Sequence, residues 1–115
     1  MHHAARGFFL VLRTERNIRI HAVCACVAIL LAFFLQFSAI EIAIVVMVSA
    51  LVITGELFNA ALERYSDIIK PRVSGYVEQV KDIMAAGVLV LAGMALFVGI
   101  LLYVPKMIDN FLNRM

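Results

Sequence analysis

Three apolar segments, each about as long as a lipid bilayer is thick, constrain the fold of this chain most strongly. They cover residues 21–38, 39–62 and 84–104, and they contain very few charged residues. An α-helix rises ~1.5 Å per residue, so ~20 residues cross a hydrocarbon core of ~30 Å. The segments predict an all-α membrane protein with three transmembrane helices.

The composition supports a membrane protein. The 115 residues are 64% hydrophobic and their mean hydropathy is +1.01, whereas soluble domains are about 45–50% apolar. A formal net charge of +2 is too small to indicate a nucleic-acid partner. Cys24 and Cys26 point ~200° apart on a helix, which excludes a disulfide between them and leaves them as apolar side chains.

The distribution of basic residues predicts the orientation. Cytoplasmic connections carry an excess of Lys and Arg. Basic residues gather before the first segment and between the second and third, while the connection between the first two segments carries none: Arg6, Arg13, Arg16, Arg19, Arg64, Lys70, Arg72 and Lys81. We therefore expect the N-terminus inside and the C-terminus outside, with Pro105 ending the third helix.

Two elements are expected on the cytoplasmic side. Residues 4–20 combine an apolar block with arginines, which is typical of a helix lying on the membrane surface. The alternative is a continuation of the first membrane helix into the cytoplasm. Residues 64–83 are expected to form a cytoplasmic loop broken by Pro71 and Gly75, followed by a helical approach to the third segment.

Polar residues form a stripe at the end of the second segment. Glu56, Asn59, Glu63 and Asp67 share a helical face ~80° wide. Glu56 is expected inside the hydrocarbon, where an ionisable side chain costs a few kcal/mol, so it is the strongest functional candidate. Two alternatives remain. Glu63 and Asp67 alone fit a solvated helix end, and Glu56 with Asn59 fits a structural hydrogen bond between helices.

The acidic residues also suggest a chemistry. Glu15 and Asp82, the latter next to Lys81, can approach the stripe from either side of it. Carboxylates hold Mg²⁺ and a lysine holds phosphate, so the group fits phosphoryl transfer to a lipid hydroxyl. The chain contains none of the phosphate-binding loops, dinucleotide turns or zinc-binding helices of soluble enzymes.

Three motifs resemble a known family. "ERNIRIHA", "GELFNAALERYSD" and "KDIMAAGVLV" are similar, in order and spacing, to the prokaryotic diacylglycerol kinase family of small trimeric membrane kinases. The resemblance extends from about Arg6 to Lys106. It implies a homotrimer in the bacterial cytoplasmic membrane, with active sites between subunits and with ATP, Mg²⁺ and a membrane lipid as reactants. Ala95 and Gly99, one turn apart in the third segment, also suit helix association.

The resemblance also implies roles for individual residues. Glu56 matches the base that activates the lipid hydroxyl, and Glu15 and Glu63 match the ligands of the metal on ATP. The other matching positions are expected to bind nucleotide or phosphate or to support the site: Asn59, Lys81 and Asp82, with Asp67, Arg6 and Asn17 as further candidates.

The N-terminal motif indicates a subtype. Glu15, Asn17 and His21 are similar to the undecaprenol kinase type, which favours a polyprenol as the acceptor over the alternative, diacylglycerol. His21 is alternatively an interfacial residue without chemistry. The chain departs from the family pattern at Gly55, at Ala60 and in residues 70–79. A non-catalytic membrane protein, with Glu56 in ion coupling or helix association, is the competing class of function.

Overall fold

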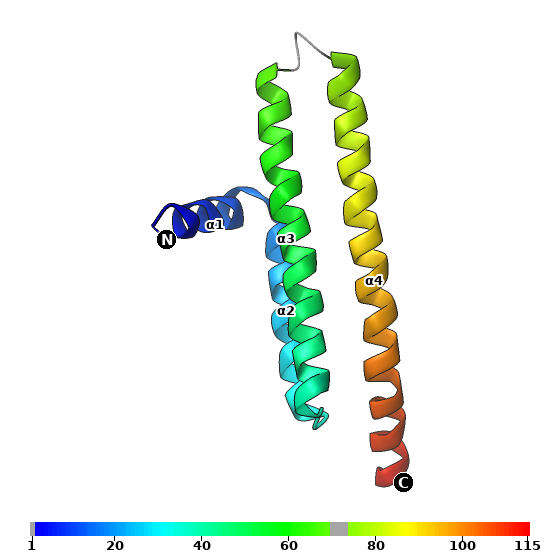
Figure 1. Cartoon of the computed structure of the whole chain (residues 1–115). Helices are drawn as coiled ribbons and strands as arrows, with labels where there is room; N and C mark the ends of the chain where they lie inside the picture. The colour runs from blue at the N-terminus through cyan, green and yellow to red at the C-terminus, as the bar shows by residue number, and fades with distance from the viewer. Residues whose placement is uncertain (1, 70–73) are drawn as a thin grey trace.

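The chain folds into one short helix and three long helices. The computed structural model describes residues 2–69 and 74–115. In chain order the helices are α1 (His2–Thr14), α2 (Arg16–Phe34), α3 (Ala39–Ile69) and α4 (Ser74–Arg114). Figure 1 shows α3 and α4 running side by side, while α1 projects sideways from the long helices. Three helices are long and apolar enough to cross a membrane, so this prediction is confirmed.

A helix break at Glu15 separates α1 from α2. Glu15 has an extended backbone, with φ −110° and ψ 115°. The last carbonyl groups of a helix lack partners within that helix. Arg19 donates to two of them, at 3.0 Å from the oxygen of Leu12 and 2.8 Å from that of Arg13. The expected single helix over 4–20 is therefore corrected, because residues 16–20 form the first turns of α2.

The α2–α3 turn is formed by two local capping motifs. The Gln36 amide donates to the Phe33 carbonyl at 3.1 Å and the Phe37 amide to that of Ala32 at 3.0 Å. With φ 60° at Gln36, this is a Schellman motif, and it ends α2 four residues before the predicted boundary at residue 38.

The beginning of α3 is capped by Ser38 and Glu41. The Ser38 amide donates to Glu41 Oε1 at 2.8 Å, and the Glu41 amide donates to Ser38 Oγ at 3.3 Å. This reciprocal pair is a capping box. It fixes the start of α3 at Ala39, which is the predicted boundary.

The two last helices are longer than the apolar segments within them. α3 continues through residues 63–69, and α4 begins at Ser74. The expected loop over 64–83 is thus mostly helical, and Pro71 lies outside the described residues. α3 has 31 residues and α4 has 41. At ~1.5 Å per residue both helices are longer than a hydrocarbon core of ~30 Å.

Pro105 lies inside α4, which continues to Arg114, so the predicted helix stop is wrong. Proline removes one backbone hydrogen bond without necessarily ending a helix. Directly after it, Lys106 forms an ion pair with Glu41 at 3.5 Å and lies 6.0 Å from the centre of the Phe37 ring. These contacts hold the continuing helix against the beginning of α3.

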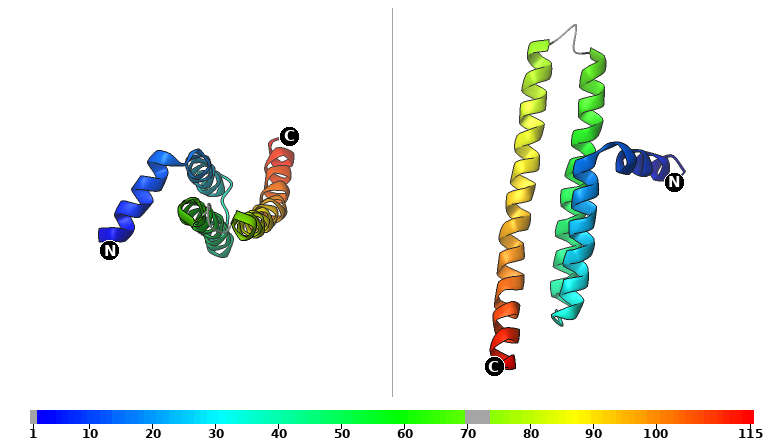
Figure 2. Two further views of the ribbon diagram at one scale, coloured as in Figure 1. Left: turned by 90° about the horizontal axis from the view of Figure 1, so that it is seen from above. Right: turned by 180° about the vertical axis from the view of Figure 1, so that it is seen from behind.

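α3 is the central helix and packs against both α2 and α4. Gly55 allows the close approach of α4, because a Cβ atom at this position would overlap Leu91 Cδ1. The views in Figure 2 show α2 and α4 on different sides of α3. Large apolar side chains remain exposed along the outer faces of the helices, for example Leu30 and Leu89, as expected for surfaces that contact lipid or other membrane helices.

Candidate functional site

Glu56 is the most deeply buried charged residue of the predicted site. Only 6% of it is exposed. Its Oε1 lies 3.2 Å from Nε2 of His21 on α2. This contact joins α2 to α3 inside the apolar part of the protein. The motif residue His21 is thus the partner of Glu56, a contact that the sequence pattern alone does not indicate.

The stripe becomes more exposed along α3 from Glu56 onward. Asn59 is half-buried, whereas Glu63 and Asp67 are exposed. Asp67 Oδ1 lies 3.4 Å from Nζ of Lys81 on α4. Lys81, which was expected near the stripe, therefore contacts Asp67, the stripe residue nearest the end of α3.

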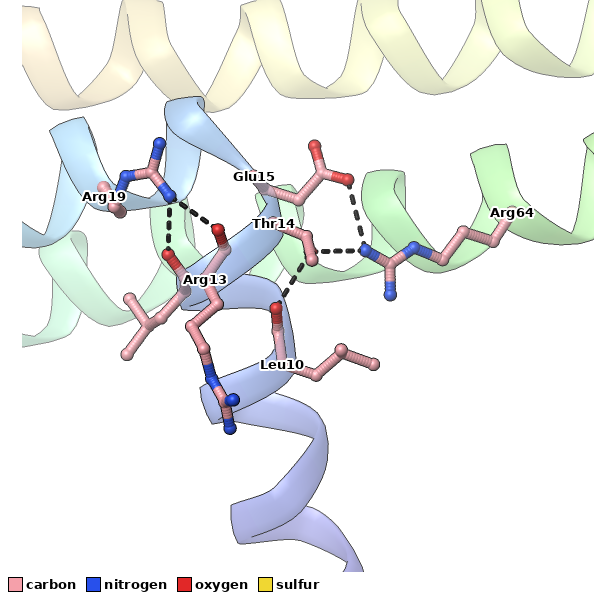
Figure 3. A network of polar contacts seen from close by, with 7 residues as sticks. Leu10, Arg13, Thr14, Glu15, Arg19 and Arg64 are labelled. Carbon is pink, nitrogen blue, oxygen red and sulfur yellow. Dashed lines mark hydrogen bonds and ion pairs between the residues drawn. The ribbon is translucent and has the colours of Figure 1, made fainter.

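A second network joins the α1–α2 break to α3 (Figure 3). Nη2 of Arg64 donates to Oγ1 of Thr14 at 2.6 Å and lies 3.4 Å from Oε1 of Glu15. Thr14 Oγ1 in turn donates to the carbonyl of Leu10 at 2.8 Å. The network places the Glu15 carboxylate beside the helix that carries Glu56 and Glu63. From the sequence, Arg64 indicates only the orientation of the chain in the membrane.

Other predicted site residues lie at the surface. Asp82, Arg6 and Asn17 are exposed, and no hydrogen bond or ion pair among the described residues involves their side chains. Part of the atypical segment 70–79, residues 70–73, lies outside the described part of the chain. Ala60, the other departure, is buried against Val11 and Ile18, so a methyl group at this position packs against α1 and α2.

An apolar cavity of about 180 Å³ lies between α2, α3 and α4. His21 lines it, together with small residues from the three helices: Ala25, Ala28, Ser49, Ala95 and Gly99. The imidazole of His21 therefore lies between the buried carboxylate of Glu56 and this cavity. Ala95 and Gly99, expected at a helix association surface, face α2 and α3 within the chain.

The carboxylates of Glu15, which is half-buried, and Glu63, which is exposed, suit a hard cation. Within residues 2–69 and 74–115, no group of three or more His, Cys, Asp or Glu side chains lies close enough to hold a metal. Glu15 and Glu63 each offer oxygen donors of the kind Mg²⁺ prefers, and phosphate oxygens normally supply further ligands. The contact of Glu15 with Arg64 is partly exposed and long at 3.4 Å, so it is worth about 0–1 kcal/mol and can be exchanged for a metal.

The spacing along α3 leaves room for a phosphate group. Seven residues separate Glu56 from Glu63, which corresponds to ~10 Å along the helix axis. Toward the end of α3, the buried carboxylate of Glu56 is thus followed by exposed carboxylates. Two basic side chains lie beside this end, Arg64 on α3 itself and Lys81 on α4. The arrangement suits a base at the apolar end and phosphate binding at the polar end.

Known proteins that are similar to this chain are named as kinases. The sequence model of the family described as prokaryotic diacylglycerol kinase matches residues 2–103. An undecaprenol kinase from Bacillus subtilis (strain 168) is 33% identical over 105 residues, which cover 91% of this chain and 85% of the relative. A diacylglycerol kinase from Synechocystis sp. (strain ATCC 27184 / PCC 6803 / Kazusa) is 33% identical over 108 residues, 93% of this chain and 62% of the relative. No solved structure gives a significant match.

The matches decide between the two classes of function that the sequence left open. The family model covers most of the chain and all the segments that carry the stripe and its neighbours. Both relatives are named as kinases of lipid alcohols, which sets aside the non-catalytic alternative. The chain therefore belongs to the prokaryotic diacylglycerol kinase family and is a membrane lipid kinase.

Proposed function

We propose that this kinase transfers the γ-phosphate of ATP to undecaprenol at the cytoplasmic surface of the bacterial membrane. The buried Glu56–His21 pair is the observation that carries the proposal. A buried carboxylate near the polar end of α3 is suited to take the proton of a lipid hydroxyl. The N-terminal motif that contains Glu15, Asn17 and His21 and the match to an undecaprenol kinase favour a polyprenol.

Glu56 acts as the general base in this proposal. Its carboxylate accepts the proton of the acceptor hydroxyl while the hydroxyl oxygen forms a bond to the γ-phosphorus. The bond from that phosphorus to the oxygen bridging to the β-phosphate breaks, and ADP leaves. General-base catalysis of this kind typically contributes 10²–10⁴-fold to the rate.

The polar end of the stripe binds the nucleotide. Glu15 and Glu63 hold Mg²⁺, which when bound neutralises charge on the transferred phosphate. Lys81 exchanges its contact with Asp67, 3.4 Å long, for a phosphate oxygen. Asn59, half-buried between Glu56 and Glu63, orients the phosphate. Asp82, Arg6 and Asn17 support this end of the site.

The active enzyme is proposed to be a homotrimer with its N-terminus inside and its C-terminus outside. The exposed apolar faces of α2 and α4 are available for contacts between subunits, and the basic residues on α1 and at the start of α2 favour the cytoplasmic side. Light scattering of the detergent-solubilised protein is expected to give three times the chain mass of 12.8 kDa. A monomer that retains full activity would refute the trimer.

The acceptor is tested with purified protein in mixed micelles. Labelled ATP and Mg²⁺ are supplied with undecaprenol or with diacylglycerol, and the label in the lipid fraction is measured. We expect a higher kcat/KM for undecaprenol. A higher kcat/KM for diacylglycerol would establish the alternative acceptor, which the family description and the Synechocystis relative favour. No labelled lipid from either acceptor would refute both.

A further inference from the structure

Glu56 is the proposed base, while His21, which contacts it, takes no part in the proposed transfer step. Nε2 of His21 lies 3.2 Å from Oε1 of Glu56, and the side chains are 33% and 8% exposed. The carboxylate is thus almost fully enclosed, while the imidazole also lines the apolar cavity between the long helices.

Among the described residues, 2–69 and 74–115, His21 is the one side chain that forms an ion pair with Glu56. In the sequence, α2 carries no charged residue after Arg19, and α4 carries none between Asp82 and Lys106. Arg19 itself is turned toward the carbonyl groups at the end of α1. On α4, the side chain of Leu91 lies against Gly55, the neighbour of Glu56.

A buried carboxylate in such surroundings needs a hydrogen-bond donor. Burying a charge without a partner is costly, and the side chain then turns toward whatever donor or water it can reach. A single donor on one oxygen satisfies part of this need and also fixes the rotation of the carboxylate. Nε2 of His21 is the side-chain nitrogen that the structure places beside Oε1, at 3.2 Å.

We infer that His21 is a positioning residue for the base. Its Nε2–H donates to Oε1 of Glu56, so Oε2 remains free and aimed at the acceptor hydroxyl. In the transfer step the hydroxyl proton moves to Oε2, the new O–P bond forms, and ADP leaves. His21 keeps its own proton throughout. The inference rests on the proposed role of Glu56, and it assigns His21 a role in turnover and none in binding ATP.

Two substitutions that differ by one methylene test this inference. The amide nitrogen of His21→Gln reaches about as far as Nε2 of histidine, whereas that of His21→Asn is too short to reach Glu56. Both variants retain a neutral polar side chain of similar kind at the same position. A reacting group misplaced by about 1 Å can cost ~10²-fold in rate.

We expect His21→Gln to keep most of the wild-type kcat and His21→Asn to lose ~10–100-fold in kcat, with KM for ATP unchanged in both. Rates are measured with the lipid assay described above, and far-UV circular dichroism and light scattering verify the fold and assembly of each variant. His21→Leu is expected to behave like His21→Asn.

Three outcomes would overturn the inference while leaving the proposed function intact. These are wild-type kcat in His21→Asn, equal losses in the Asn and Gln variants with unchanged helix content, or an increase in KM for ATP without a change in kcat. A wild-type protein that phosphorylates neither lipid would instead refute the proposed function.

Discussion

The contact between Gly55 and Leu91 makes a prediction about how α4 is held against the helix that carries the base. A Cβ atom at residue 55 would overlap Leu91 Cδ1, while the next atom, Leu91 Cγ, is 3.8 Å away. The substitution Gly55→Ala therefore forces the end of one side chain to move and leaves the backbone of α4 unobstructed.

The size of the effect follows from two opposing contributions. Overpacking of a well-packed contact typically costs 1–3 kcal/mol, and replacing glycine by alanine inside a helix gains about 1 kcal/mol. Gly55→Ala is thus expected to lower the free energy of unfolding by roughly 0–2 kcal/mol. In a Leu91→Ala background the overlap is absent, and the same change is expected to stabilise by up to about 1 kcal/mol.

The assay is a double-mutant cycle measured by unfolding of detergent-solubilised protein in increasing SDS, followed by circular dichroism. The coupling energy between residues 55 and 91 is expected to be about 1–3 kcal/mol. Gly93→Ala provides the matched control, because a Cβ atom on Gly93 of α4 meets no atom within 4 Å. A coupling near zero between residues 55 and 91 would contradict the close approach of the two helices.

Four further substitutions test other parts of the site and fold. Glu63→Gln and Glu15→Gln are each expected to raise the Mg²⁺ concentration for half-maximal activity at least about tenfold, and an unchanged requirement in both would exclude them as metal ligands. Thr14→Val removes an acceptor for Arg64 and is expected to speed amide hydrogen exchange in α1, whereas unchanged exchange would deny the network any role in holding this helix. Tyr103→Phe removes the hydrogen bond to the Ala28 carbonyl and is expected to lower the free energy of unfolding by about 0.5–1.5 kcal/mol, while an unaltered value would show that this bond contributes nothing.

Much of the architecture could be predicted because it depends on local patterns. The apolar segments identified the three long helices, and helical periodicity placed Glu56 and its neighbours on one face. The expected depth of Glu56 in the bilayer made it the strongest functional candidate, and the low exposure of its side chain agrees with that choice. These features need only the chain's own periodicity and length.

The helix ends were harder to predict, because they depend on capping and on contacts between helices. The start of α3, for example, is set by the reciprocal hydrogen bonds of Ser38 and Glu41. α4 continues beyond Pro105, where Lys106 meets Glu41 and Phe37, residues more than 60 positions earlier in the chain. Nothing near Pro105 in the sequence indicates that contact.

The pairing of site residues was also beyond the sequence. His21 was a motif residue with an interfacial alternative, and Arg64 was a charge beside the membrane. Their contacts with Glu56 and Glu15 form only when α2, α3 and the α1–α2 break pack together. The sequence thus indicated which residues belong to the site, while the structure shows which of them touch.

Glu56 as the base of lipid phosphorylation is the central claim, and the rate of phosphate transfer in Glu56→Gln tests it most directly. Glutamine keeps the size of the side chain and can still accept a hydrogen bond from His21, but it cannot take a proton from the acceptor. We predict a loss of ~10²–10⁴-fold in kcat with helix content and assembly unchanged, while Glu41→Gln, altered at the opposite end of α3, retains near wild-type activity. Near wild-type turnover in a folded Glu56→Gln protein would contradict the account.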